Sequence, residues 1–96
     1  MNQINFHNSL CKAITDISKI TREQWTGKTR KFSDCRSIEI EYLIRQCNLK
    51  KSEAARLVNR HRCTVIHHLK RYDNMIAFNR QFKVLVAKIY EKVNQN

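Results

Sequence analysis

The sequence contains no proline and only one glycine, at position 27. Tight turns between β-strands are built mainly from glycine and proline, so this composition disfavours a β-rich fold. Acidic residues are also scarce, with eight Asp and Glu against nineteen Lys and Arg. No apolar run approaches the ~20 residues that a membrane-spanning helix requires. We therefore expect a single all-α domain over residues 1–96, with no membrane as a partner.

Basic residues give the chain a formal net charge of +11, which draws polyanions toward its surface. Residues 45–71 hold eight of these cations and a single acid, Glu53. This regional excess favours nucleic acid as the partner over a charge that only keeps the protein in solution. The eight cations are Arg45, Lys50, Lys51, Arg56, Arg60, Arg62, Lys70 and Arg71.

The first seven residues (MNQINFH) lack the basic start and the apolar core of a secretion signal. A cytoplasmic location is therefore expected. In that reducing compartment the four cysteines are predicted to be thiols, and the helical positions of Cys35 and Cys47 suit burial.

Helical spacing of apolar residues predicts a first helix over about residues 8–18. Residues 21–24 (TREQ) fit a capping box, whose first and last side chains satisfy each other's backbone donors, and Trp25 follows as a core anchor. Residues 26–33 have no apolar periodicity and contain the glycine, which indicates a basic loop.

Residues 37–42 (SIEIEY) alternate like a strand, but the apolar spacing continues as a helix and no second strand-like run could pair with them. About residues 34–47 are therefore predicted to be helical. A short helix over about residues 51–58, a turn at residues 59–60 and a longer helix over about residues 62–76 follow. The inward face of the short helix is predicted to be Ala54, Ala55, Leu57 and Val58.

The last helix is predicted to begin after Asn79, whose side chain can cap it. Its apolar stripe either covers the core or forms a homodimer with a second copy of the chain, and the sequence leaves both open. The stripe consists of Phe82, Leu85, Val86, Ile89 and Val93.

A short helix, a turn of about three residues and a second helix with a polar, basic amino end form the helix-turn-helix plan, here over about residues 51–76. In that plan the second helix lies in the major groove of DNA. Such helix pairs also occur as ordinary αα corners, so the pattern alone leaves DNA binding open.

Residues 60–71 (RHRCTVIHHLKR) resemble the signature of the C-terminal DNA-binding domain of the bacterial replication initiator DnaA, which typically reads RDHTTVLHACRK. Residues 20–31 are similar to the family's short helix and basic loop, Arg36 and the helix after it to its long helix, and residues 48–55 (NLKKSEAA) to its NLSLPEIG. The resemblance covers roughly residues 8–92. It implies a compact, Trp-repressor-like bundle of about six helices, located in the bacterial nucleoid or, for a phage or plasmid protein, in the host cytoplasm.

The resemblance also implies double-stranded DNA as the partner. Residues from the signature arginine onward would enter the major groove, the basic loop would reach the minor groove through Lys28 or Arg30, and Lys51 and Ser52 would meet the backbone at a helix N-terminus. The candidate DNA-binding residues are Lys28, Arg30, Lys31, Arg36, Lys50, Lys51, Ser52, Arg60, His61, Arg62, Cys63, Thr64 and His67.

The family's DHT triplet is replaced here by His61, Arg62 and Cys63, so base recognition is expected to differ. Arg62 either contacts guanine O6 and N7, which discriminates between bases by about 1 to 3 kcal/mol, or only neutralises a phosphate. Marking an origin, competing with an initiator and repressing transcription all remain open as biological roles.

Chemical alternatives are weaker. Residues 27–29 (GKT) end like a P-loop, but the upstream glycine and the preceding strand are missing, so no ATPase module is predicted. Cys63 and His67 together with His7 and Cys11 could supply four zinc ligands, yet the sequence has no CxxC pair, and we predict no metal or cofactor. Nothing suggests an oxyanion donor or a pocket for a small-molecule substrate, so no enzyme is predicted.

Aromatic side chains could stack on single-stranded bases, but most fall at core spacing. Phe32, beside the basic loop, stays open. The side chains expected in the core are Trp25, Tyr42, Phe78, Phe82 and Tyr90. The alternative function is a nucleic-acid-binding or structural protein without sequence preference, whose basic surface meets RNA, an acidic protein or a packaged genome.

Overall fold

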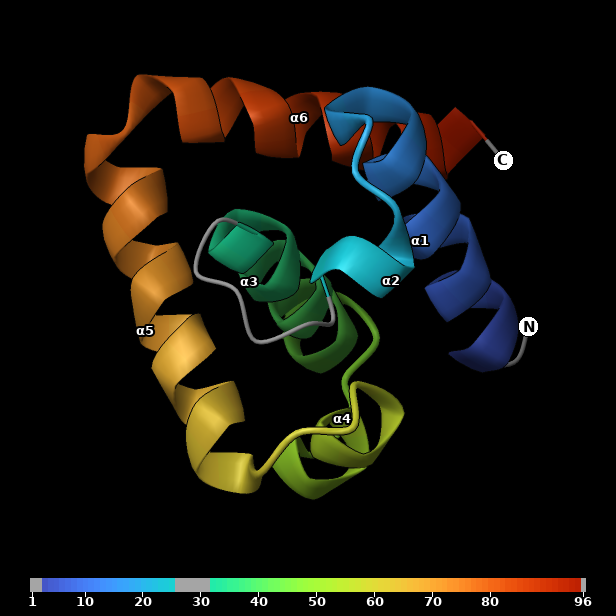
Figure 1. Cartoon of the computed structure of the whole chain (residues 1–96), viewed down its shortest axis with the longest axis vertical. Helices are drawn as coiled ribbons and strands as arrows, with labels where there is room; N and C mark the ends of the chain where they lie inside the picture. Colours follow the sequence, from blue (N-terminus) through green and yellow to red (C-terminus); the bar gives the residue numbers. More distant parts are fainter. Residues whose placement is uncertain (1–2, 26–31, 96) are drawn as a thin grey trace.

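The computed structural model describes residues 3–25 and 32–95, which form six α-helices, a π-helical segment and no strand. The prediction of an all-α fold is confirmed. Around a central α3, the helices α5 and α6 meet at a corner, α1 packs along α6, and α4 lies at the far end of α5 (Figure 1). The elements are α1 Gln3–Ser18, α2 Arg22–Trp25, α3 Ser33–Glu41, η2 Tyr42–Gln46, α4 Lys51–Leu57, α5 Arg62–Phe78 and α6 Arg80–Gln95. None of the helices within these described ranges is both long and apolar enough to cross a membrane.

Both predicted helix caps are present. The Thr21 N–H donates to Gln24 Oε1 (2.8 Å) and the Gln24 N–H donates to Thr21 Oγ1 (3.4 Å), which is the reciprocal pattern of a capping box. At the start of α6, the Phe82 N–H donates to Asn79 Oδ1 (2.9 Å). The first helix is longer than predicted, since α1 already begins at Gln3.

The helix predicted over residues 34–47 is α-helical only as far as Glu41. It continues as the π-helical η2, in which the Cys47 N–H donates to the Tyr42 carbonyl five residues earlier (3.0 Å). The side chain of Gln46 repeats this spacing by donating to Glu41 Oε1 (3.2 Å). Asn48 then adopts a left-handed φ of 58°, which asparagine tolerates, and the chain turns toward α4.

Two apolar clusters hold the helices together. The first joins α1, α2, α3, α5 and α6 and includes an edge-to-face contact between Tyr72 and Phe82. We call the second the helix-turn-helix core, because it seats α4 and the first half of α5 on the end of α3 and on η2. Its buried members are Ile40, Leu43, Leu49, Ala54, Ala55, Val58, Val65 and Leu69.

Two burial predictions are wrong. Phe78, which ends α5 at the corner with α6, is 88% exposed. Leu57, at the last position of α4, is 37% exposed. Cys47 is half-buried and packs against the helix-turn-helix core. Phe32, which the sequence left open, packs half-buried against the first cluster.

Candidate nucleic-acid interface

The turn between α4 and α5 is a Schellman motif. Asn59 has a left-handed φ of 54°, and its N–H donates to the Arg56 carbonyl (3.2 Å). The next N–H, of Arg60, donates to the Ala55 carbonyl (2.9 Å). These two bonds satisfy carbonyls that the end of α4 would otherwise leave unpaired. They confirm the turn predicted at residues 59–60 and fix the direction in which α5 leaves.

His61 caps the amino end of α5. Its Nδ1 accepts a hydrogen bond from the Cys63 N–H (3.2 Å), so the neutral ring carries its proton on Nε2. His61, Arg62, Cys63 and His67 are exposed, whereas Thr64 is half-buried. This end of α5 lies beside α4, at the end of the molecule opposite α6 (Figure 1). The predicted recognition residues are therefore accessible to a partner.

The amino end of α4 presents a second group of exposed residues, Lys50, Lys51 and Ser52. Glu53 holds this end in place, since its Oε1 accepts from the Lys50 N–H (3.2 Å). The negative charge of Glu53 also complements the positive end of the helix dipole. Two cations thus stand at the helix start where the sequence predicted a backbone contact.

Not all of the charge predicted for this region is available. Arg45 makes two hydrogen bonds to the Asp73 carboxylate (2.6 and 3.0 Å), and Arg71 donates to Asp34 Oδ1 (2.8 Å). Both acids lie outside residues 45–71, so the one-sided count in the sequence overstated the local charge. Apart from the paired Arg45, the exposed cations of the region are Lys50, Lys51, Arg56, Arg62 and Lys70.

Arg36, predicted to contact DNA, is not on the open surface. It is buried, and its guanidinium donates to the Trp25 carbonyl (3.0 Å) and to Ser33 Oγ (2.9 Å). It borders a pocket together with Arg60 of the turn before α5 and with Thr64 and His68 of α5. The expectation that Arg36 lies on the open surface is therefore corrected: its side chain is buried and forms part of the wall of this pocket. The basic-loop candidates Lys28, Arg30 and Lys31 lie outside the described residues.

His68 packs inside the protein. Its Nδ1 lies 3.1 Å from Ser37 Oγ, which joins α5 to α3. Burial, followed by the positive charge of Arg36 and further neighbouring cations, lowers the pKa of His68 to about 4. The ring is thus neutral at pH 7, and it packs α5 against α3.

The carboxylate of Glu39, which sequence reasoning did not single out, connects three elements, α1, α2 and α3. It lies 2.6 Å from His7 Nε2, and it accepts from Arg22 Nε (3.3 Å) and from Trp25 Nε1 (3.4 Å). Burial raises the pKa of Glu39, but His7 and then Arg22 bring it below its usual value. Arg22 also donates to the Leu57 carbonyl (3.3 Å), so this network ties the end of α4 to the core.

The four zinc ligands considered in the sequence do not come together. In the described part of the chain, one group of potential ligands forms, from His7, Cys11 and Glu39, with ligand atoms within 4.8 Å of one another. The Arg22 guanidinium already donates a hydrogen bond to Glu39 Oε2, the same oxygen that His7 and Cys11 contact. Burial, and then the charge of Glu39, raise the pKa of the Cys11 thiol to about 12. A protonated thiol beside an ion pair is better explained as a structural network than as a metal site.

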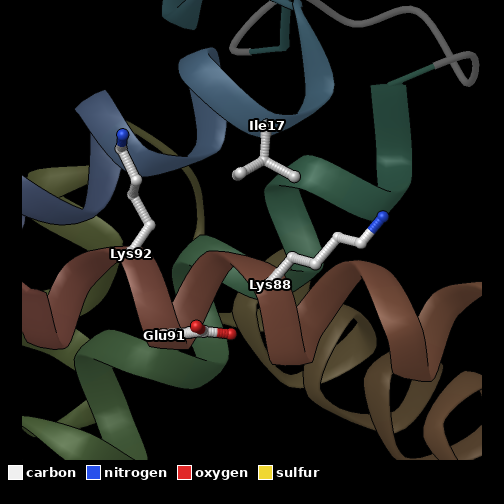
Figure 2. A pocket seen from close by; sticks show the side chains of 4 residues that line it. All are labelled: Ile17, Lys88, Glu91 and Lys92. Atoms are coloured by element: carbon white, nitrogen blue, oxygen red, sulfur yellow. The ribbon is translucent and has the colours of Figure 1, made fainter.

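A surface pocket of about 190 Å³ lies between α1 and α6. Figure 2 shows Ile17 of α1 above α6, with Lys92 reaching toward α1. Its described lining is Ile17, Lys88, Glu91 and Lys92.

None of the protein-family models, curated proteins or solved structures compared with this chain gives a significant match. The resemblance to the initiator domain therefore stays a prediction based on the residues quoted above. Function is inferred from the side chains of this chain and from their arrangement.

Proposed function

We propose that this chain binds double-stranded DNA, with the amino end of α5 in the major groove. The observation that carries the proposal is the exposed group His61, Arg62 and Cys63, presented by a helix that follows α4 through a tight Schellman turn. The major groove is about 12 Å wide and admits an α-helix. The short connection and the shared core make α4 and α5 one rigid unit, as reading a groove requires.

Charge supports the same orientation. Lys50 and Lys51 stand exposed around the start of α4, and Arg62 stands exposed at the start of the neighbouring helix α5. Cations on two neighbouring helix ends can contact phosphates on the groove walls while α5 lies between them. The resemblance to the initiator domain adds a minor-groove contact from the basic loop, through Lys28 or Arg30. A stand-alone domain of this kind would regulate replication initiation or transcription.

The direct test is binding to a labelled duplex selected from a random pool. We expect recovered duplexes to share a motif containing guanine, different from the usual initiator box, because Arg62 stands where the family has histidine. Affinity should fall steeply with salt, since a domain neutralising about six phosphates loses roughly a thousandfold between about 50 and 200 mM salt. A pool that acquires no preference contradicts sequence-specific recognition.

The alternative is a basic protein that binds any polyanion, favoured by the net charge of +11. Duplex DNA, single-stranded RNA and heparin are compared at matched salt. Tighter binding to the duplex supports the proposed function. Equal affinity for all three supports the alternative, because charge alone does not distinguish among them.

A further inference from the structure

A pocket of about 260 Å³ opens between α3 and the first half of α5. Its described lining is Arg36, Arg60, Thr64 and His68. Pockets that hold drug-sized ligands span about 300 to 1,000 Å³, so this one suits a group of a few atoms. Each of its four described lining residues has a polar group, two of them are arginines and none is a carboxylate, which favours an anionic group as the occupant.

Positive charge is concentrated here. The pKa of the Arg36 guanidinium lies below its usual range, first because of burial and then because Arg60 and Arg71 are close. Arg36 and Arg60 both line the pocket, and Arg71, which is paired with Asp34 (2.8 Å), lies close to Arg36. The positive charges of Arg36 and Arg60 repel each other, and an anion bound between them relieves this repulsion.

The pocket walls are fixed in advance. Hydrogen bonds to the Trp25 carbonyl and to Ser33 Oγ hold the Arg36 guanidinium in one orientation. A pre-oriented guanidinium loses little conformational freedom when it binds the oxygens of a phosphate. Glu39 lines a small adjoining cavity with Arg36 and Arg60, but its carboxylate is engaged by His7 and Arg22, as described above.

From this geometry we infer that the pocket binds a single phosphoryl group. Arg36 and Arg60 supply charged donors, and the Thr64 hydroxyl supplies a third. The group comes either from the backbone of a bound duplex or from a free phosphate compound. The first source rests on the proposed function, because Arg60 and Thr64 flank the exposed residues of α5. The second source, a free phosphate compound, does not depend on the proposed function.

The test uses the full chain and inorganic pyrophosphate, titrated calorimetrically in low-chloride buffer. Arg60→Gln and Thr64→Val each remove one donor, and binding should weaken about tenfold or more for the charged contact. Arg80→Gln is the matched control, because Arg80 is an exposed arginine at the opposite end of α5. Arg36→Gln is added only if its circular dichroism and thermal unfolding match the parent, since Arg36 is buried.

The same variants are titrated with the duplex, with and without pyrophosphate. Competition between the two, together with loss of duplex affinity when one linkage is made a neutral methylphosphonate, identifies the DNA backbone as the source. Pocket-dependent pyrophosphate binding without competition identifies a free compound. If that binding persists in a chain that binds no duplex, the proposed function fails and the pocket stands.

The inference is overturned if Arg60→Gln and Thr64→Val bind pyrophosphate and duplex as Arg80→Gln does. Undetectable pyrophosphate binding combined with unchanged duplex affinity in both pocket variants overturns it as well. In either case, duplex binding by the parent chain would leave the proposed function in place.

Discussion

The Nε2 atom of His7 lies 2.6 Å from Oε2 of Glu39, across 32 residues of sequence. This contact joins α1 to α3, and Arg22 extends it to the end of α4. The helix-turn-helix is therefore positioned by a buried polar network as well as by apolar packing. The consequence is that groups far from the proposed interface should affect it.

Replacing Glu39 with glutamine should lower the free energy of unfolding by about 3 kcal/mol, because a buried ion pair loses one partner. Glu91→Gln is the control: the same change on the exposed face of α6 should stay within about 0.5 kcal/mol. Urea unfolding followed by circular dichroism measures both. Equal stability of the two variants would show that the network contributes nothing.

Stability should decrease below neutral pH because of His68. Its pKa is about 4 in the folded chain and about 6.5 when unperturbed. Between these values the unfolded chain binds a proton that the folded chain does not, so stability is full above pH ~6.5 and falls toward pH ~4. The loss is on the order of 2 to 3 kcal/mol.

Unfolding at several pH values is compared between the parent, His68→Gln and the exposed neighbour variant His67→Gln. Glu39 and Glu41 are present in both the parent and the variant. Subtracting the variant's unfolding free energy from that of the parent at each pH therefore removes their contributions. His68→Gln should show a smaller fall, and His67→Gln most of the fall of the parent, because burial and Arg36 lower the pKa of His68 more than His67 does. Parallel curves for the parent and His68→Gln would contradict the assignment.

The variant Arg62→Ala distinguishes between the two DNA contacts proposed for Arg62, one with a guanine base and one with a phosphate. Loss of a guanine contact relaxes preference at one base-pair position and costs about 1 to 3 kcal/mol on the selected duplex, whereas loss of a phosphate contact weakens all duplexes alike and lowers the salt slope by about one. Arg80→Ala, with the same charge change at the opposite end of α5, should retain most of the affinity. Arg62→Ala with parental affinity and preference would remove this residue from the interface.

Cys63 provides a natural footprint of the interface. It is exposed, whereas Cys35 is buried and the pKa of Cys11 is raised to about 12 by burial and by Glu39. Iodoacetamide should thus modify Cys63 first, and Cys63→Ser should remove that fast reaction. Duplex at about ten times its dissociation constant should slow modification about tenfold, in proportion to the unbound fraction. An unchanged rate under saturation would place Cys63 outside the contact.

Substitutions of Asn59 test the conformation of the turn between α4 and α5. Its φ of 54° suits glycine, so Asn59→Gly should change stability by only a few tenths of a kcal/mol. Asn59→Ala should cost about 1 kcal/mol, because a Cβ without a polar group disfavours the left-handed region. Thermal unfolding measures the pair. Alanine as stable as glycine would mean that the turn is free to change its conformation.

Much of the fold is determined by the sequence alone, because its signals are local. Helical periodicity, the capping box beginning at Thr21, the Asn79 cap and the turn at residues 59–60 all depend on groups within a few positions of one another. The same local signals indicated the exposed amino end of α5, where a polar stretch follows a tight turn.

Only the tertiary structure decided which charges remain available. The Arg45–Asp73 and Arg71–Asp34 pairs join residues 28 and 37 positions apart. Burial of Arg36 depends on a carbonyl of α2. Sequence periodicity does not reveal such pairings, because they form only when separate helices meet. The packing of these helices then decides which cation is neutralised by an acid, which is buried and which stays exposed.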